Sequence, residues 1–178
     1  MDNYLEEIVV KKNRTLNNIL YALSMVLMVF FGIVALLNLS TMSVSGSIVM
    51  SLVYVAVFGG LAFLIWWKKD MLRMEYEYTF TNGELDFAYV VGNKKRKELG
   101  SMRVKNVDAC GLVSSGSFNR YVNTPGVKKM NWFLNRDAEL LFFYFQKDGN
   151  KRIIICEPSE EMVNMIKLYL PRGVFQVN

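Results

Sequence analysis

The sequence predicts a membrane α-helical hairpin followed by an α+β domain, an antiparallel β-sheet closed by a C-terminal helix. Three observations lead to this fold class. No Asp, Glu, Lys or Arg occurs between Thr15 and Trp67. This uncharged block has room for two membrane crossings of about 20 apolar residues each. Beyond it, polar and apolar residues alternate as in half-buried strands, and after Pro158 the spacing becomes helical.

Two membrane spans account for the uncharged block. They are expected near Asn18–Leu39 and Ser47–Trp67, joined by the small polar loop STMSVSG at 40–46. A buried hairpin of a soluble helical protein would show a polar stripe, and none is present. A cleaved signal peptide would have a shorter apolar core and an Ala-x-Ala-like cleavage site. The predicted parts are therefore an N-terminal segment (1–17), a transmembrane hairpin (18–67) and a domain (68–178).

The charges beside the two spans predict how the hairpin is oriented. Cations precede the first span and follow the second, whereas the connecting loop has none: Lys11, Lys12, Arg14, Lys68, Lys69 and Arg73. By the positive-inside rule, both termini are expected in the cytoplasm, with the hairpin in the plasma membrane. Trp66 and Trp67, beside Lys68 and Lys69, are expected at the membrane interface as an aromatic belt.

Small residues recur within the two spans, in part at four-residue spacing: Gly32, Ala35, Ser47, Ser51, Ala56, Gly59 and Gly60. Such positions let two helices approach closely. We expect them to pack within the hairpin, with packing against a partner helix as the alternative. Because neither span carries an ionisable group, an ion pathway through this chain alone is not predicted.

Strands of the domain follow from alternation and turn chemistry. Residues 76–80 and 85–91 alternate around Asn82-Gly83, the preferred dipeptide of a type I′ hairpin turn. Gly92-Asn93 is expected to form another turn. Further strands are predicted at 94–100, 104–114, 138–146 and 151–157, which gives about six antiparallel strands. Residues 138–146 are apolar on both faces and should form a central strand.

The closing helix is predicted to begin after Ser159, a favourable N-cap, and to end at Pro171. Glu160 and Glu161 would lie in its first turn, where the helix dipole favours them. The two cysteines, Cys110 and Cys156, lack CxxC spacing, so a zinc site is not expected. We expect buried free thiols, with a disulfide as the alternative.

Several segments together resemble a known family. The stretch EYEYTFTNGELDF, the basic strand after it and IIICEPSEEMVNMIKLYLP look like a bacterial pleckstrin-homology-like (PH-like) domain. With the two spans, the whole chain is similar to an uncharacterised family of small two-span bacterial membrane proteins. The resemblance implies a bent antiparallel sheet or barrel capped by a C-terminal helix. It implies no activity and no catalytic residues. Residues 114–137, where a further strand could run, are predicted largely as loop.

Two basic segments are the candidate binding sites. The 114–137 segment combines cations with aromatic residues, which suits an acidic protein partner or an anionic membrane surface: Arg120, Tyr121, Lys128, Lys129, Trp132 and Phe133. Alternatively, the aromatics pack over the sheet and the cations are solvated. The run Lys94, Lys95, Arg96 and Lys97 could orient the domain on anionic lipid or protect a strand edge. Nucleic-acid binding ranks below both, since no binding motif surrounds the run.

Catalysis has little support in the sequence. The chain has 0 histidines among its 178 residues, which removes the commonest general base and metal ligand. No P-loop, GxSxG or dinucleotide fingerprint occurs, and no metal or cofactor is predicted. The net charge of +5 belongs to residues 68–178. We therefore expect a non-enzymatic, membrane-anchored module that binds a protein partner or anionic lipid. The alternatives are an accessory subunit of a larger membrane transport or envelope assembly, and an enzyme that uses carboxylates alone.

Overall fold

A computed structural model of the chain describes residues 3–42, 46–92 and 94–176. Its contacts divide the chain into two compact units. One contains the helical hairpin and comprises Asn13–Met74 and Val91–Lys94. The other contains the sheets and comprises the described residues up to Lys12, Glu75–Val90 and those from Lys95 onward. The predicted 40–46 loop and the Gly92-Asn93 turn lie partly outside the described residues.

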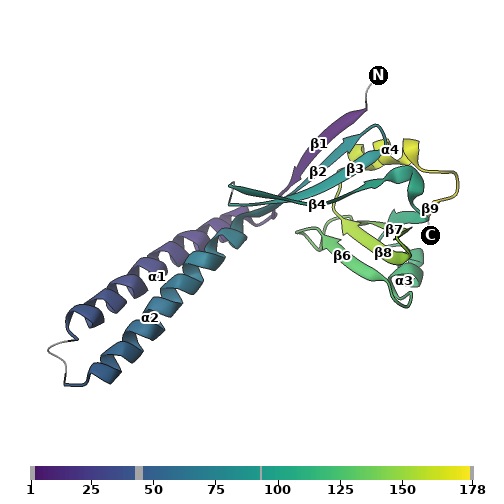
Figure 1. Cartoon of the computed structure of the whole chain (residues 1–178). Helices are drawn as coiled ribbons and strands as arrows, with labels where there is room; N and C mark the ends of the chain where they lie inside the picture. The colour runs from purple at the N-terminus through teal and green to yellow at the C-terminus, as the bar shows by residue number, and fades with distance from the viewer. Residues whose placement is uncertain (1–2, 43–45, 93, 177–178) are drawn as a thin grey trace. The chain divides into compact units, whose positions relative to one another are not determined.

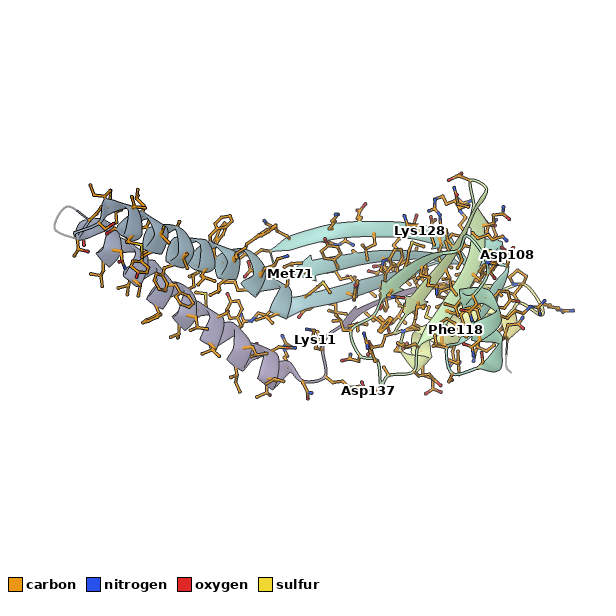
Figure 2. All side chains as sticks on the ribbon, turned by 90° about the horizontal axis from the view of Figure 1, so that it is seen from below. Lys11, Met71, Asp108, Phe118, Lys128 and Asp137 are labelled. Carbon is orange, nitrogen blue, oxygen red and sulfur yellow. The ribbon has the colours of Figure 1, made fainter. Side chains whose placement is uncertain are left out.

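The helical unit is built from α1 (Arg14–Ser40) and α2 (Ile48–Lys68), followed by the short 3₁₀ helix η1 (Lys69–Arg73). Both α-helices are long and apolar enough to cross a membrane. Only 6% of either apolar stretch is buried, and Figure 2 shows side chains projecting outward along both helices. Core helices of soluble proteins bury most of such a stretch. The two helices thus have the composition and the exposure of membrane spans.

Glycines of the hairpin do not form the contact that was expected of them. A Cβ added at Gly32, Gly59 or Gly60 would meet no atom within 4 Å, outside its own helix and chain neighbours, in the part of the chain that the structure describes. Contact between α1 and α2 instead includes large side chains, with the rings of Phe31 and Phe58 stacked at 6.0 Å. Of the small residues expected to pack within the hairpin, Ser51 is buried, at 5% exposed, whereas Gly32, Gly59 and Gly60 lie against open space.

The first sheet has the order β1-β2-β3-β4. Its strands are β1 (Tyr4–Val9), β2 (Met74–Thr81), β3 (Glu84–Val91) and β4 (Lys95–Arg103). The turn between β2 and β3 has φ of 49° at Asn82 and 89° at Gly83, as a type I′ turn requires. The sequence did not predict β1, which pairs antiparallel with β2 along its whole length.

The second sheet has the order β6-β8-β7-β5-β9. Its strands are β5 (Ala109–Leu112), β6 (Lys128–Trp132), β7 (Leu141–Lys147), β8 (Asn150–Cys156) and β9 (Phe175–Gln176). The predicted central strand is β7, in the middle of the sheet. Two pairings are parallel, β6 with β8 and β5 with β9. The prediction of about six strands, all antiparallel, is therefore wrong.

Two other local predictions need correction. The strand expected at 104–114 begins only at Ala109, because Val104–Asn106 form the 3₁₀ helix η2. The expected loop at 114–137 contains α3 (Gly116–Val122) as well as β6. Across the described residues the strands form sheets of four and five, and closure into a barrel is not found.

Figure 1 shows the strands and helices of the domain, and the packing of their side chains explains why these elements form. The sheets face each other, since the Phe87 ring of β3 lies 4.7 Å from that of Trp132 on β6. Helix α4 (Glu160–Tyr169) closes the domain with Met162 and Ile166 fully buried, and its N-cap Ser159 accepts a hydrogen bond from the Met162 N–H at 3.2 Å. On the second sheet's other face, α3 covers Phe142 and Ile153. Burial on both faces explains the unbroken apolar run of β7.

Both cysteines lie inside this core. Cys110 and Cys156 are free thiols, and neither is more than 1% exposed. Burial raises the pKa of the Cys110 thiol well above its ordinary value. The prediction of buried free thiols is confirmed.

Candidate functional site

The end of the hairpin next to η1 holds cations on an aromatic ring. The guanidinium carbon of Arg73 lies 3.8 Å from the centre of the Tyr21 ring of α1. The ammonium of Lys69 lies 5.6 Å from the same ring and 2.7 Å from the Asp70 carboxylate. A ring face attracts cations through its quadrupole, so Tyr21 holds both side chains at this end of the hairpin.

The turn between β3 and β4 joins the same unit. The N–H of Gly92 donates to the carbonyl oxygen of Arg73 at 3.2 Å. Gly92 has a φ of +59°, and a Cβ there would lie 3.3 Å from the Cβ of Asp70. A side chain would therefore be strained by the backbone and crowded by η1. This contact places Lys94 at the end of the hairpin, although Lys94 is 20 or more residues beyond η1 in the sequence.

The helical unit thus contains Lys94, the first residue of the basic run, together with the predicted interface residues Trp66, Trp67, Lys68 and Lys69. Trp66 and Trp67 are 56% and 61% exposed. The Lys68 ammonium lies 4.6 Å from the centre of the Trp67 ring. We call the cations Arg14, Lys68, Lys69, Arg73 and Lys94 the basic collar. Its members come from four segments of the helical unit, and sequence inspection alone did not join them.

The rest of the basic run lies in β4, an edge strand of the first sheet. Lys95, Arg96 and Lys97 are all exposed. Arg96 is ion-paired, with its Nε 2.6 Å from the Glu77 carboxylate of β2. Lys95 and Lys97 have no ion-pair partner among the described residues. Arg96 is thus paired within its own sheet, whereas Lys95 and Lys97 face solvent. Binding of lipid by the basic run stays a prediction.

Aromatic residues of the 114–137 segment pack against the domain. The Tyr121 ring lies 5.0 Å from that of Tyr144, and Trp132 packs on Phe87. Phe133 is half-buried against the second sheet's outer cluster. In Figure 2, Phe118 of α3 and Lys128 of β6 mark the two elements that replace the expected loop.

The cations of this segment are exposed instead: Arg120, Lys128 and Lys129. Arg120 lies 6.0 Å over the Tyr121 ring. The six residues that were singled out therefore divide into three packed aromatics and three exposed cations. Binding of a partner by these cations stays a prediction.

A polar cluster that the sequence did not reveal ties the segment before α1 to the second sheet. The Asn135 side chain is only 8% exposed. Its oxygen accepts from the Lys12 N–H at 2.9 Å, and its Nδ2 donates to the Val10 carbonyl at 2.9 Å and the Glu157 carboxylate at 2.7 Å. No local motif reveals such a cluster, because Asn135 lies more than 100 residues from Lys12 and Val10 in the chain.

Within residues 3–42, 46–92 and 94–176, no three His, Cys, Asp or Glu side chains gather closely enough to hold a metal ion. The prediction of a non-enzymatic protein remains untested.

A family model described as "Bacterial PH-like domain (DUF6106)" matches residues 1–176. The chain belongs to this family. Membership covers both the hairpin and the sheets, so DUF6106 describes the whole two-part chain. It confirms the PH-like resemblance stated from the sequence. The DUF6106 description names a fold and no activity, ligand or partner. Searches of curated proteins and of solved structures gave no match to the chain.

Proposed function

We propose that this DUF6106 member is a non-enzymatic, membrane-anchored interaction module. The hairpin spans the plasma membrane with both termini in the cytoplasm. The basic collar lies on anionic lipid, and the PH-like domain is presented to a protein partner at the cytoplasmic face. The observation that carries this proposal is the basic collar itself. Cations from separate segments gather at one end of the hairpin, and this asymmetry is what the positive-inside rule describes.

Strand pairing supports the same topology. β1 precedes α1, β2 follows α2, and the two strands are hydrogen-bonded neighbours in one sheet. A chain that enters and leaves the hairpin through paired strands has both flanks on one side of any membrane that the hairpin crosses. Anchoring also keeps the domain concentrated near membrane partners, so weak contacts suffice for binding.

Hydrogen exchange tests the contact with lipid. Full-length protein in nanodiscs of phosphatidylglycerol and phosphatidylcholine should exchange more slowly at the β3–β4 turn than in phosphatidylcholine alone. The variant K94Q/K95Q should lose this difference, since each cation near an anionic surface contributes about 1 kcal/mol. The control K147Q/K151Q, at the β7–β8 turn, removes the same charge and should keep the difference in exchange between the two lipids. Equal exchange of the wild type in both lipids would contradict the proposal.

Crosslinking tests the partner surface. The variant R120Q/K128Q/K129Q keeps the packed aromatics and removes only exposed cations. It should lose crosslinks to a cytoplasmic protein in native membranes while its melting temperature stays unchanged. Capture equal to that of the wild type would remove these three cations from the proposed binding surface.

An accessory-subunit role is the second candidate, and one observation favours it. The glycines Gly32, Gly59 and Gly60 are open to approach by another helix. Substituting Gly59 and Gly60 by Leu would then remove a partner that co-purifies at fixed stoichiometry in mild detergent. A partner retained by this variant would weigh against the accessory role.

A further inference from the structure

A cavity of about 410 Å³ lies at the β2–β3 turn. Its lining comes from the turn, the end of β4, η2 and the end of α4, and includes Asn82, Gly83, Glu84, Arg103, Lys105 and Tyr169. All of these elements belong to the sheet unit. The volume is within the range of small-molecule sites, about 300–1,000 Å³. None of its lining residues belongs to the basic collar, to α3 or to β6.

The wall formed by the turn is fixed by contacts on several sides. The Asn82 N–H donates to the Asn3 carbonyl at 2.9 Å, and the Asn82 side-chain oxygen accepts from the Asn3 N–H at 3.0 Å. Gly83 has a φ of +89°, and a Cβ there would lie 2.6 Å from a Tyr169 ring atom. Only glycine lets the turn approach this ring so closely. A wall fixed in this way loses little entropy when a ligand binds.

Two cations are brought to this wall by a single hydrogen bond. The Val104 N–H donates to the Gly83 carbonyl at 2.9 Å, and the Val104 side chain is fully buried. Arg103 and Lys105 flank Val104, so both remain exposed at the rim of the cavity. Neither has an ion-pair partner among the described residues. The fold therefore places two cations without a described ion-pair partner at the rim of the cavity.

Other polar groups lining the cavity also have hydrogen-bond donors without an acceptor among the described residues. The Tyr169 oxygen accepts from Asn3 Nδ2 at 2.8 Å, which leaves the hydroxyl proton without an acceptor among the described residues. Asn82 uses its side-chain oxygen, and its amide N–H groups have no described partner. Glu84 is the one carboxylate in the lining. Cationic and neutral donors thus predominate, a combination that suits the oxygens of a phosphate group.

We propose that this cavity binds a phosphate group, carried by a small phosphate ester or by a lipid headgroup. Arg103 and Lys105 supply the charge, and Asn82 and Tyr169 supply neutral donors.

Calorimetric titration of the full-length protein in detergent with glycerol 1-phosphate tests the proposal, with glycerol as the neutral comparison. We expect saturable binding of the phosphate ester alone. The variant R103Q/K105Q should weaken it at least about 10-fold, because charge-assisted bonds are among the strongest in proteins. K128Q/K129Q, which removes the same charge elsewhere in the domain, should change the affinity less than about 2-fold. E84Q should tighten binding, because it removes the carboxylate that opposes phosphate.

The same variants in nanodiscs distinguish the two sources of phosphate. If soluble esters fail to bind but phosphatidylglycerol nanodiscs protect the β2–β3 turn from hydrogen exchange, and R103Q/K105Q abolishes that protection, the group comes from lipid. The proposal is overturned if neither probe binds, or if R103Q/K105Q and K128Q/K129Q weaken binding equally. These outcomes are independent of the partner crosslinks and of exchange at the β3–β4 turn.

Discussion

Asn135 links the segment before α1 to the second sheet through a single amide. Its three side-chain bonds satisfy backbone groups of Lys12 and Val10 and reach the carboxylate of Glu157. Such groups cost free energy when they are buried without partners. The residue looks unremarkable in sequence because Asn is common in loops, and its role depends entirely on distant partners.

Substituting Asn135 by Ala should lower the free energy of unfolding of the domain by about 1–3 kcal/mol, because buried donors and acceptors lose their partners. Thermal denaturation in detergent, followed by near-UV circular dichroism, measures the change. Asn131→Ala is the control, since this exposed side chain on β6 makes no described hydrogen bond. A variant as stable as the wild type would mean that water replaces the amide without loss.

Glu7 gives the domain a pH dependence of defined sign. Its carboxylate accepts from the Ser159 N–H at 3.0 and 3.1 Å. Burial raises the pKa of Glu7, more than its hydrogen bonds with Ser159 lower it. A raised pKa in the folded state means that stability from this group is complete below the unfolded-state pKa. It is lost as the pH rises through the folded-state pKa.

The variant E7Q should therefore gain stability relative to the wild type as the pH rises from acidic to neutral. Its amide oxygen still accepts from Ser159, whereas the buried charge is gone. Melting temperatures of both proteins across this range test the sign. E6Q, which removes a charge from the opposite, exposed face of β1, is the control. If the melting temperature of E7Q relative to that of the wild type fell with rising pH, burial of the Glu7 carboxylate would be refuted as the cause.

At the scale of elements, predictions based on local chemistry were confirmed. Asn82-Gly83 forms the expected turn, and Ser159 caps the expected helix. β1 was missed because only one face of its six residues is half-buried, and its partner strand is about 70 residues away. Sequence patterns report on residues that are close along the chain, whereas β1 forms by pairing with a strand that is distant in the sequence.

The 114–137 segment was misread for a related reason. Its mixture of Ser, Asn, Gly and cations resembles a loop, yet Tyr121 and Phe118 anchor α3 on the Phe142 ring. β6 is formed by parallel pairing with β8, which no hairpin signal announces. The candidate site was affected in the same way. It follows the alternative stated from the sequence, in which the aromatics pack on the domain and the cations face solvent, whereas the rings that they contact required the tertiary structure.

Charge on the edge strand β4 should prevent edge-to-edge pairing, as lysines on exposed edges do. The variant K95V/K97V should therefore self-associate in detergent, which light scattering detects. K95E/K97E keeps charge on the edge and should remain as monodisperse as the wild type. Aggregation of the glutamate variant, with the valine variant unaffected, would show that edge charge is not what keeps the strand unpaired.

For the whole molecule, the proposed topology is testable with single cysteines. The native Cys110 and Cys156 are buried, so they contribute little background labelling while the domain is folded. A membrane-impermeant maleimide added to intact cells should label Gly46→Cys, between the helices. It should label Ser114→Cys, in the domain, only after the membrane is opened. The reverse pattern would invert the proposed orientation.

The pairing of β1 with β2 also constrains the order of events during synthesis. Tyr4–Val9 leave the ribosome before α1 and α2, but their partner strand follows only after both helices have been made. In the proposed topology, β1 therefore stays unpaired, until β2 is made, on the side of the membrane where the domain folds. If the helices insert so that only one flank remains on that side, the four-stranded sheet cannot be completed. In the proposed topology, a wrongly inserted chain would therefore leave the edge of β2 unpaired and exposed to proteases.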